Sequence, residues 1–298
     1  MTAEIIDGKK IASEVKKELK GRIGKLIDSG IEPSLIAVLV GDDPVSKQYV
    51  NMKHKACAKL GIKSRIVTLP ESTSESKLLD LIGYFNQDNT VHGILVQLPL
   101  PDHINQLKIN LAVDVNKDVD GFHPANLGKM LLGKPSFIPA TPLGIMELLN
   151  RSGNNPEGKH TVILGRGELV GRPLSVLISL KSNGANSTVT LCHSGTKELG
   201  HFTKQADILV CAMGRAEMIS ADMIKPGAVV IDSGTTAVDD STSEKGYRIA
   251  GDVDFESASE VAGYITPVPG GVGPMTIAML LANTVSAAEK LAGKSDER

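Results

Sequence analysis

Apolar and polar positions along the chain follow two patterns in turn. Residues 11–27 repeat apolar side chains at helical spacing, whereas residues 35–40 and 91–97 are short apolar runs typical of buried strands. Turn residues rich in Gly, Asp and Pro follow the first strand at 41–44. Strands that alternate with helices of about 10–15 residues indicate βαβ units and a parallel sheet. The pattern therefore predicts an α/β fold.

Local signals set the ends of two predicted helices. Asp43 followed by Pro44 is typical of an N-cap and a first helical position, and Gly61 is the expected stop of that helix. The run Ser-Thr-Ser-Glu at 72–75 fits a capping box, which would open a helix that ends near Phe85.

The same alternation continues in the second half, which we expect to begin near Pro139. A final segment rich in Ala and Leu, 274–291, is predicted to form one long helix. At roughly 150 residues per domain, a chain of 298 residues favours two domains. The strands predicted in this half are 161–164, 188–192, 208–212 and 229–232.

Composition excludes several classes of protein. Apolar residues make up 41% and charged residues 22%, which excludes disorder, collagen and coiled coil as the main state. A net charge of −2 leaves no electrostatic footprint for nucleic acid or for an anionic membrane. With no Trp and only 3% aromatic residues, a platform that stacks single-stranded bases is not expected.

The cysteines and the apolar runs favour a reducing compartment. Cys57, Cys192 and Cys211 are widely spaced and show no CxxC or Cys/His ligand spacing, so we expect neither disulfides nor a metal site. The first residues include an acid and no apolar run, so we expect no secretory signal. No apolar run approaches the ~20 residues of a membrane span. We therefore expect a soluble, cytoplasmic protein.

A glycine-rich turn follows the predicted strand 161–164 and opens a helix. Small residues there allow backbone N–H groups to approach a diphosphate at the positive end of the helix, although the turn could also be a plain connection. The next strand ends without the acid usual for NAD, so Arg166 with Ser194 favours NADP, unless Arg166 is only a solvated loop cation. The turn reads Gly165, Arg166, Gly167, Glu168, Leu169, Val170, Gly171.

One helix carries a candidate base. Tyr49 and Lys53 are four residues apart and share a face, with Ser46 one turn earlier. A lysine at the edge of an apolar stripe can enter a cleft, where a lowered pKa lets the neutral amine act as a base. The alternative is that Lys53 lies with other lysines on a solvated face. The stripe is expected to consist of Tyr49, Met52, Ala56 and Leu60.

Three further segments could line a site. Gln97 ends the predicted strand 91–97, where ligands of parallel sheets collect, or is an ordinary edge amide. The acidic loop around Asp118 and Asp120 could cap a helix or hold a ligand's amino groups, and its lack of further carboxylates disfavours a metal. Residues 267–274, rich in Pro and Gly, cannot be regular structure and either line a site or link domains.

These motifs together carry a resemblance over nearly the whole chain. The sequence resembles the bifunctional methylenetetrahydrofolate dehydrogenase/cyclohydrolase family, called FolD in bacteria. The resemblance implies oxidation of 5,10-methylenetetrahydrofolate to the methenyl cation with NADP, then hydrolysis to 10-formyltetrahydrofolate, in one-carbon metabolism that serves purine biosynthesis. The most specific runs are Gln-Leu-Pro-Leu-Pro at 97–101, Lys-Asp-Val-Asp-Gly at 117–121 and Pro-Val-Pro-Gly-Gly-Val-Gly-Pro-Met-Thr at 267–276.

The resemblance assigns roles to the candidate residues. It implies that Lys53 activates water or shuttles its proton, and that Gln97 hydrogen-bonds Lys53 and sets its state. Tyr49 would stack on the folate ring, and Asp120 would accept hydrogen bonds from the amino edge of the pterin. Ser46 would be a supporting neighbour. A neutral lysine suits this chemistry, because a permanently charged one would repel the methenyl cation.

The resemblance also implies a folate and nicotinamide loop and a cofactor site. The loop consists of Pro269, Gly270, Gly271 and Val272, with Pro274 starting the terminal helix. The residues expected at NADP lie in the glycine-rich turn and after neighbouring strands: Gly165, Arg166, Gly167, Val170, Gly171, His193, Ser194, Gly214, Gly234 and Thr235.

Two positions depart from the family pattern. Gly167 stands where Ser is common, and the lost hydroxyl would weaken the grip on the 2′-phosphate. Gly234 is followed by Thr235 and Thr236 where the family often has Gly-Ile-Asn, so we expect a local change in cofactor contacts.

The implied architecture is two α/β domains with a cleft between them. Residues 1–140, completed by the C-terminal helix 273–298, would bind folate, and residues 141–272 would form a Rossmann-like parallel sheet that binds NADP. We expect a homodimer, paired through the cofactor domain, that acts on tetrahydrofolate derivatives carrying polyglutamate and binds neither nucleic acid nor membrane. The alternatives are a monofunctional dehydrogenase, which the intact Tyr49, Lys53 and Gln97 disfavour, and a non-catalytic nucleotide-binding regulator.

Overall fold

The computed structural model describes residues 2–243 and 246–293. They form two compact units, each with its own parallel sheet. The six-stranded unit comprises the residues up to 13 together with 141–276, and the three-stranded unit comprises 14–140 together with the residues from 277 onward. The expected α/β class with two domains is confirmed.

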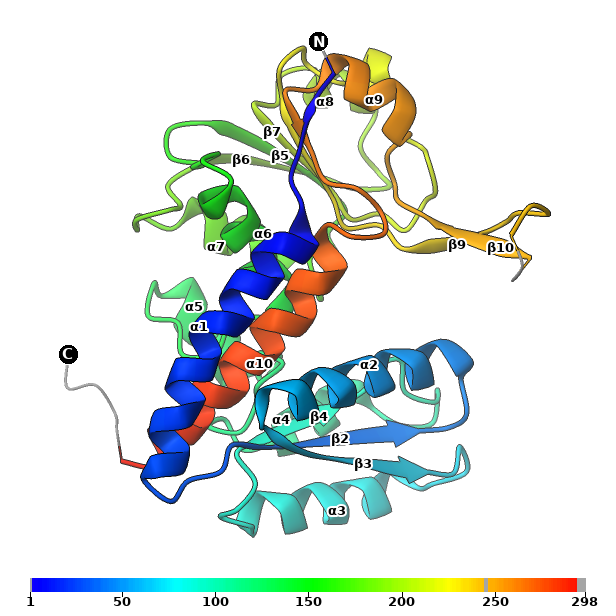
Figure 1. Cartoon of the computed structure of the whole chain (residues 1–298). Coiled ribbons are helices and arrows are strands. Elements are labelled where there is room, and N and C mark those ends of the chain that lie inside the picture. Colours follow the sequence, from blue (N-terminus) through cyan, green and yellow to red (C-terminus); the bar gives the residue numbers. More distant parts are fainter. Residues whose placement is uncertain (1, 244–245, 294–298) are drawn as a thin grey trace. The chain divides into compact units, whose positions relative to one another are not determined.

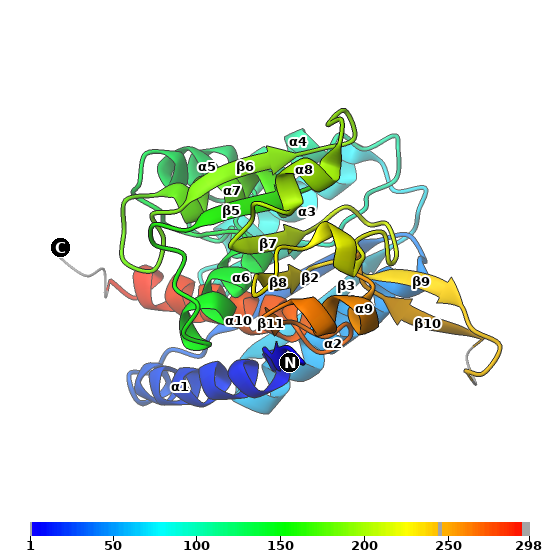
Figure 2. The same ribbon diagram turned by 90° about the horizontal axis from the view of Figure 1, so that it is seen from above.

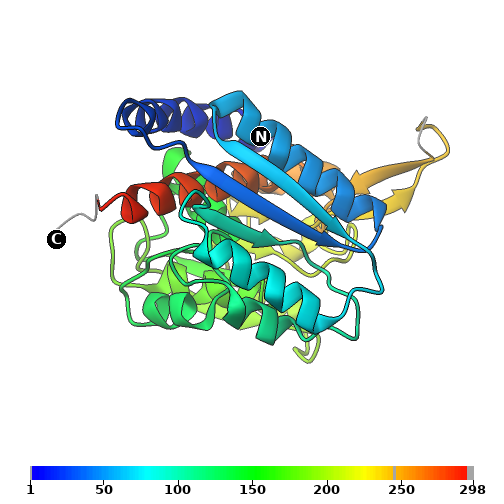
Figure 3. The ribbon, with the colours of Figure 1, turned by 90° about the horizontal axis from the view of Figure 1, so that it is seen from below.

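The three-stranded unit is a small parallel sheet covered on both faces. Figures 1 and 3 show α2 on one face and α3 on the other. All but the first residue of β2 are buried, as expected for a central strand between two helical layers. The strands lie in the order β3 (Lys63–Leu69), β2 (Ser34–Val40), β4 (Gly93–Val96), and the helices are α1 (Gly8–Asp28), α2 (Pro44–Leu60), α3 (Glu75–Gln87), α4 (Gln106–Ala112), α5 (Pro124–Leu131) and α10 (Val272–Leu291).

Helix α2 begins and ends as the sequence predicts. The Asp43 side chain accepts a hydrogen bond from the Ser46 backbone N–H at 2.7 Å, and Pro44 occupies the first turn. Gly61 ends the helix with φ of 80°, in the left-handed region that favours glycine. These local signals suffice because both caps act on backbone groups of the helix itself.

The apolar stripe predicted on α2 is confirmed at Leu60 but wrong at Tyr49 and Met52. The buried positions of this helix are Ser46, Val50, Cys57 and Leu60, whereas Tyr49 and Met52 are exposed. The buried face therefore includes a polar Ser, and larger apolar side chains point to solvent. Helical spacing alone allowed either face, because apolar residues occur on both.

The capping box predicted at 72–75 is also wrong. The N-cap of α3 is Ser74, whose hydroxyl accepts from the Lys77 backbone N–H at 3.3 Å. The Glu75 carboxylate instead accepts from the Asn105 backbone N–H and from the Lys108 ammonium, each at 2.8 Å. Glu75 thus ties α3 to the beginning of α4, a contact between distant segments that no local pattern indicates.

The six-stranded unit contains the larger parallel sheet. Figure 2 shows its strands side by side. Its core includes Val162, Leu164, Leu209 and Val230, all fully buried on successive strands. The strands lie in the order β1 (Glu4–Ile5), β11 (Tyr264–Ile265), β8 (Val229–Asp232), β7 (Ile208–Cys211), β5 (His160–Leu164), β6 (Thr188–Cys192), and the helices are α6 (Ala140–Arg151), α7 (Gly171–Ser179), α8 (Leu199–Thr203), α9 (Phe255–Val261) and the short 3-10 helix Ala221–Met223.

The domain assignment of the N-terminal residues differs from the expected one, in which residues 1–140 formed one domain. Strand β1 pairs in parallel with β11, and the Ile6 backbone N–H donates to the Ile265 carbonyl oxygen at 2.8 Å. This pairing places the start of the chain in the six-stranded unit rather than with residues 14–140. A strand of two residues is too short to leave an apolar pattern in the sequence.

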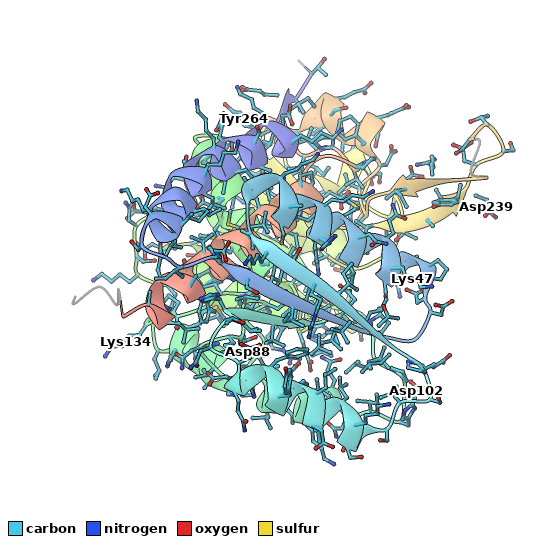
Figure 4. The ribbon with its side chains drawn as sticks, turned by 60° about the horizontal axis from the view of Figure 1, so that its bottom comes forward. Lys47, Asp88, Asp102, Lys134, Asp239 and Tyr264 are labelled. Carbon is cyan, nitrogen blue, oxygen red and sulfur yellow. The ribbon has the colours of Figure 1, made fainter. Side chains whose placement is uncertain are left out.

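A two-stranded hairpin projects from the six-stranded unit, which the sequence did not indicate. Strands β9 (Thr236–Asp239) and β10 (Tyr247–Ala250) pair in antiparallel fashion, and Asp239 lies at the end of β9 (Figure 4). Within the described ranges, no helix combines the length and apolarity that a membrane span needs.

Candidate active site

Lys53 lies on α2 of the three-stranded unit and contacts a fixed amide. Its Nζ donates a hydrogen bond to Gln97 Oε1 at 3.1 Å. Gln97 Nε2 in turn donates to the Leu98 carbonyl oxygen at 2.7 Å. Because the amide nitrogen is engaged by the backbone, the amide oxygen is held toward the amine. Gln97 is therefore more than an ordinary edge amide, and the Lys53 side chain is directed into the unit.

Asp120 shares this environment. Burial lowers the pKa of Lys53, and the negative charge of Asp120 partly opposes that shift. Burial raises the pKa of Asp120 to about 6, with Lys53 opposing the rise and Asp118 adding to it. An amine and a carboxyl group thus lie in a weakly polar site, where each group titrates closer to neutral pH than it would in water.

Asp118 holds the backbone of the loop that carries Asp120. The Asp118 carboxylate accepts from the backbone N–H groups of Gly121, Phe122 and His123 at 3.1, 3.1 and 2.9 Å, and from Asn126 Nδ2 at 2.7 Å. Asp118 is saturated with donors and has a structural role. In the described part of the chain, no cluster of three His, Cys, Asp or Glu side chains could hold a metal ion.

Lys117 at the start of this loop and Asn283 on α10 anchor the loop to other segments, and neither role was predicted from the sequence. The Lys117 ammonium donates to three carbonyl oxygens at the end of α3, at 2.8–3.0 Å. Asn283 Nδ2 on α10 donates to the carbonyl oxygens of Val119 and Ile138 at 2.8 and 2.9 Å. Lys117 lies in the Lys-Asp-Val-Asp-Gly run and could have been suspected. Asn283 is one polar residue in an apolar helix, which was the available signal.

Apolar side chains lie exposed on α2 beside this group. Tyr49 is 39% exposed and Met52 is 43% exposed. Such side chains offer a flat ligand an apolar surface that water covers poorly. Ser46, one turn before Tyr49, is buried, and its backbone N–H donates to the N-cap Asp43. Stacking by Tyr49 stays a prediction.

The glycine-rich turn of the six-stranded unit is shaped by close packing. Gly165 has φ of 109°, and a Cβ there would lie 2.1 Å from the Ala212 carbonyl oxygen. A Cβ on Gly171 would lie 1.7 Å from the Gly165 carbonyl oxygen. Gly167 has open space around it. Two of the glycines are therefore required by the turn itself, and the third is not.

The start of α7 leaves little of its backbone to an anion. Val170 is the N-cap and provides no side-chain cap, but the Arg172 N–H donates to the Gly167 carbonyl oxygen at 3.1 Å and Pro173 has no N–H, so of these three positions the Gly171 N–H is the one left for a ligand. Arg166 is exposed in the turn, and Ser194 is exposed after the adjacent strand β6. His193 Nδ1 accepts from the Gly195 backbone N–H at 3.1 Å, which orders this second loop. These features fit the diphosphate and ribose of a dinucleotide.

The remaining cofactor candidates follow neighbouring strands of the same sheet. Gly214 comes after β7, with φ of 68°, and Gly234 and Thr235 come after β8. Because the carboxyl ends of parallel strands meet at one edge, these residues and the glycine-rich turn lie at the same edge of the sheet.

The Pro- and Gly-rich segment follows β11 at that edge. Gly270 has φ of 122°, and a Cβ on Gly271 would lie 2.7 Å from the Thr266 Cβ. Helix α10 begins at Val272, two residues before the Pro274 start that we expected. Pro269 to Val272 thus belong to the six-stranded unit, whereas the Lys53 group belongs to the three-stranded unit. The expected cleft stays a prediction.

Both halves of the chain match models of one protein family. Residues 6–120 match the catalytic domain of tetrahydrofolate dehydrogenase/cyclohydrolase, and residues 139–292 match its NAD(P)-binding domain. Two bacterial relatives, each named bifunctional protein FolD, are 52% identical to this chain. The Flavobacterium johnsoniae protein aligns over 98% of this chain and 99% of its own length, and the Moorella thermoacetica protein over 97% and 100%.

Solved structures agree with this assignment. The bifunctional methylenetetrahydrofolate dehydrogenase/cyclohydrolase of Campylobacter jejuni superposes with a TM-score of 0.91 at 47% identity, over 97% of this chain and 99% of that one. The Trypanosoma brucei dehydrogenase-cyclohydrolase, complexed with NADP and an inhibitor, gives 0.92 at 37% identity, over 97% and 98%. The chain therefore belongs to the tetrahydrofolate dehydrogenase/cyclohydrolase family.

Proposed function

We propose that this chain carries out both reactions of its family, with Lys53 as the group that moves the proton. It oxidises 5,10-methylenetetrahydrofolate to 5,10-methenyltetrahydrofolate with NADP, and hydrolyses that product to 10-formyltetrahydrofolate. The observation that carries the proposal is the hydrogen bond from Lys53 to the fixed Gln97 amide, in an environment that lowers the pKa of the amine.

The oxidation needs positioning rather than a base. Loss of hydride from the methylene carbon leaves a cation delocalised over the two flanking nitrogens, and no proton has to be removed. Bound NADP supplies the hydride acceptor. Tyr49 offers its exposed ring to the flat substrate, and the Asp120 carboxylate accepts hydrogen bonds from the pterin amino edge. These contacts orient the reacting carbon.

The hydrolysis requires a proton acceptor. A water oxygen bonds to the methenyl carbon, and its proton passes to the neutral Lys53 amine. The bond from that carbon to N5 then breaks as N5 takes a proton from the Lys53 ammonium. The hydroxyl proton passes back to the amine as the formyl C=O forms, so one proton is released to solvent overall. A lowered pKa makes the neutral amine available, and Gln97 Oε1 holds the amine in place through these transfers.

The residues at the sheet edge of the six-stranded unit are assigned to NADP. The diphosphate would lie at the start of α7, against the turn that the close packing of Gly165 and Gly171 shapes, with the Gly171 N–H as a donor. Arg166 and Ser194, exposed on adjacent strand ends, would hold the 2′-phosphate. NADP is therefore expected to be preferred over NAD, and equal efficiency with both would remove Arg166 from this role.

Replacing Lys53 by Met tests the central assignment. The variant keeps an unbranched apolar side chain of the length of the Lys53 stem and removes the amine. We expect its methenyl hydrolysis rate to fall about 100-fold or more, with a smaller loss in hydride transfer as Gln97 loses its partner. The purified protein is given methylenetetrahydrofolate and NADP, and the absorbances of NADPH and of the methenyl cation report the two steps.

Lys47→Met is the matched control. Lys47 lies near the start of the same helix, labelled in Figure 4, and pairs with the exposed Asp42. Its loss should leave both rates within about twofold, since surface ion pairs contribute little. An unchanged hydrolysis rate in Lys53→Met would remove Lys53 from its role.

The same assay separates the alternatives. Reduction of NADP with persistent methenyl species would indicate a monofunctional dehydrogenase. Binding of NADPH without turnover would indicate a nucleotide-binding regulator. The Lys53, Gln97 and Asp120 group favours the two-step enzyme over both, because neither alternative needs a buried amine.

The finer properties follow from the family resemblance. We infer that the substrates carry polyglutamate, that the enzyme acts in the cytoplasm, and that it is a homodimer paired through the six-stranded unit. Sedimentation equilibrium tests the last inference, and a mass of one chain at all concentrations would contradict it.

A further inference from the structure

Two buried aspartates lie beneath loops assigned to the cofactor. The fully buried Asp252 carboxylate accepts from three consecutive backbone N–H groups, those of Met213, Gly214 and Arg215, at 2.5, 3.3 and 2.8 Å. Consecutive N–H groups that converge on one point make a concave anion site, which elsewhere binds phosphate. Here the protein's own carboxylate fills that site from below.

Asp232 holds Asp252 and joins a second loop to it. Asp232 Oδ1 accepts from the backbone N–H groups of Gly234 and Asp252 at 2.8 and 3.0 Å, and its Oδ2 accepts from the Val253 N–H at 2.9 Å. The loops after β7 and β8 are therefore connected through two carboxylates. Each carboxylate receives three backbone hydrogen bonds.

Glycines make room for this arrangement. A Cβ on Gly251 would lie 1.9 Å from Asp232 Oδ2, and a Cβ on Gly234 would lie 2.5 Å from both the backbone N and Oδ1 of Asp252. The loops are thus packed directly onto the two side chains. Movement of either carboxylate would displace backbone atoms at the cofactor edge of the sheet.

Stability alone does not account for the two carboxylates. Burying a charge is costly, and two adjacent carboxylates also repel each other. A carboxylate is the side chain that only accepts, so it can satisfy three converging N–H groups at once. An amide would turn an NH₂ group toward one of them. The pair therefore favours one backbone geometry at the expense of folding free energy.

We propose that Asp252, supported by Asp232, is a positioning residue for NADP, because it fixes the 213–215 backbone against which the cofactor binds. The assignment rests on the proposed function, which places Gly214 and Gly234 at the cofactor. Neither aspartate touches the ligand. Both act through the loops whose N–H groups they hold.

The test is Asp252→Asn, with NADPH affinity measured by the fluorescence of the bound cofactor. We expect the Kd for NADPH and the KM for NADP to rise about tenfold or more, since an unsatisfied N–H displaces the loop. Hydrolysis of supplied methenyltetrahydrofolate, assayed without NADP, should stay within about twofold. A general loss of folding would reduce hydrolysis and leave the KM of the remaining enzyme unchanged.

Asp254→Asn is the matched control and Asp232→Asn the milder variant. Asp254 lies two residues away and caps α9 by accepting from the Ser257 backbone N–H at 3.5 Å. Its loss should leave NADPH affinity unchanged. Asp232→Asn keeps the acceptor for Gly234 and Asp252 and loses the one for Val253. Because Asp232 acts on the 213–215 backbone only through Asp252, this variant should weaken NADPH binding in the same direction by less. It also serves if Asp252→Asn does not fold.

The outcomes are distinct. Unchanged NADPH affinity in the folded variants overturns the inference, and so does an equal loss of hydrolysis with unchanged affinity. A wild-type protein that binds NADPH without turnover would contradict the proposed function, while weaker binding by Asp252→Asn would still support the positioning role. Wild-type protein that does not bind NADPH would overturn both.

Discussion

At the scale of single residues, the site depends on two groups whose charged forms are both disfavoured. Lys53 and Asp120 are moved toward neutrality by burial, and each partly restores the charge of the other. Lys53 could be singled out from its spacing to Tyr49. Its hydrogen bond to Gln97 and the burial of Asp120 depend on segments 44 or more residues away in sequence, which no local pattern describes.

Asp120 gives the activity a dependence on pH. Its pKa of about 6 means that it is protonated, and a poorer acceptor for the pterin amino edge, as the pH falls through 6. We expect the KM for the folate substrate to rise below that pH, measured as initial rates between about pH 5 and pH 8. In Asp120→Asn the KM should be higher throughout and independent of pH. A wild-type KM that does not change across this range would contradict the assignment.

The raised pKa of Asp120 also makes the stability of the fold depend on pH. Because the pKa of Asp120 is raised in the folded state from 3.8 to about 6, the folded protein binds more protons than the unfolded chain in that window. The contribution of Asp120 to the free energy of unfolding therefore falls as pH rises from about 3.8 to 6 and stays low above it. Function retains a carboxylate that stability alone would disfavour.

At the scale of elements, local sequence signals predicted correctly the features that depend on backbone groups within one helix or strand. The caps of α2 at Asp43 and Gly61 were predicted, as was β6 over Thr188–Cys192. The capping box and part of the apolar stripe failed because Glu75 and the faces of α2 are decided by distant segments. Short elements such as α4, α5, α9 and the hairpin strands β9 and β10 were missed, since a few residues carry little periodicity.

A substitution in the glycine-rich turn tests how this turn sets the preference for NADP over NAD. Gly167 has no atom near the place of a Cβ, so Gly167→Ser should fold normally and add a hydroxyl beside Arg166. We expect the ratio of kcat/KM for NADP to that for NAD to rise about fivefold to tenfold, as one added hydrogen bond to a charged phosphate permits. Initial rates with each cofactor give the ratio.

Gly171→Ser is the steric control for this prediction. Its Cβ would meet the Gly165 carbonyl oxygen at 1.7 Å, so it should lose cofactor binding outright. If Gly167→Ser leaves the cofactor ratio unchanged, the 2′-phosphate does not lie at this position of the turn.

At the scale of the whole molecule, the C-terminal helix supports the loop that carries Asp120. Asn283 donates to two backbone oxygens more than 140 residues earlier in the chain. The resemblance placed this helix with the first domain, but nothing in the sequence indicated which side chain makes the connection. The role of this amide is evident from its burial and its contacts in the structure, and not from the sequence pattern of the helix.

Asn283→Ala should weaken both the fold and the site. It leaves the Val119 and Ile138 oxygens without their donor, so we expect the free energy of unfolding to fall by about 1–3 kcal/mol and the folate KM to rise. Urea denaturation and initial rates check the two effects. Asn155→Ala is the control, because Asn155 is exposed and accepts only from a neighbouring backbone N–H. Equal stability of the two variants would contradict the prediction.

The pairing of β1 with β11 bears on how the protein is made. Each unit combines two segments that are far apart in the sequence, since the first strand completes the six-stranded sheet and the last helix contributes to the three-stranded unit. During synthesis β1 must therefore wait for its partner strand until residues 264 and 265 have been made. The six-stranded sheet is completed only after the residues 14–140 of the other unit have been synthesised.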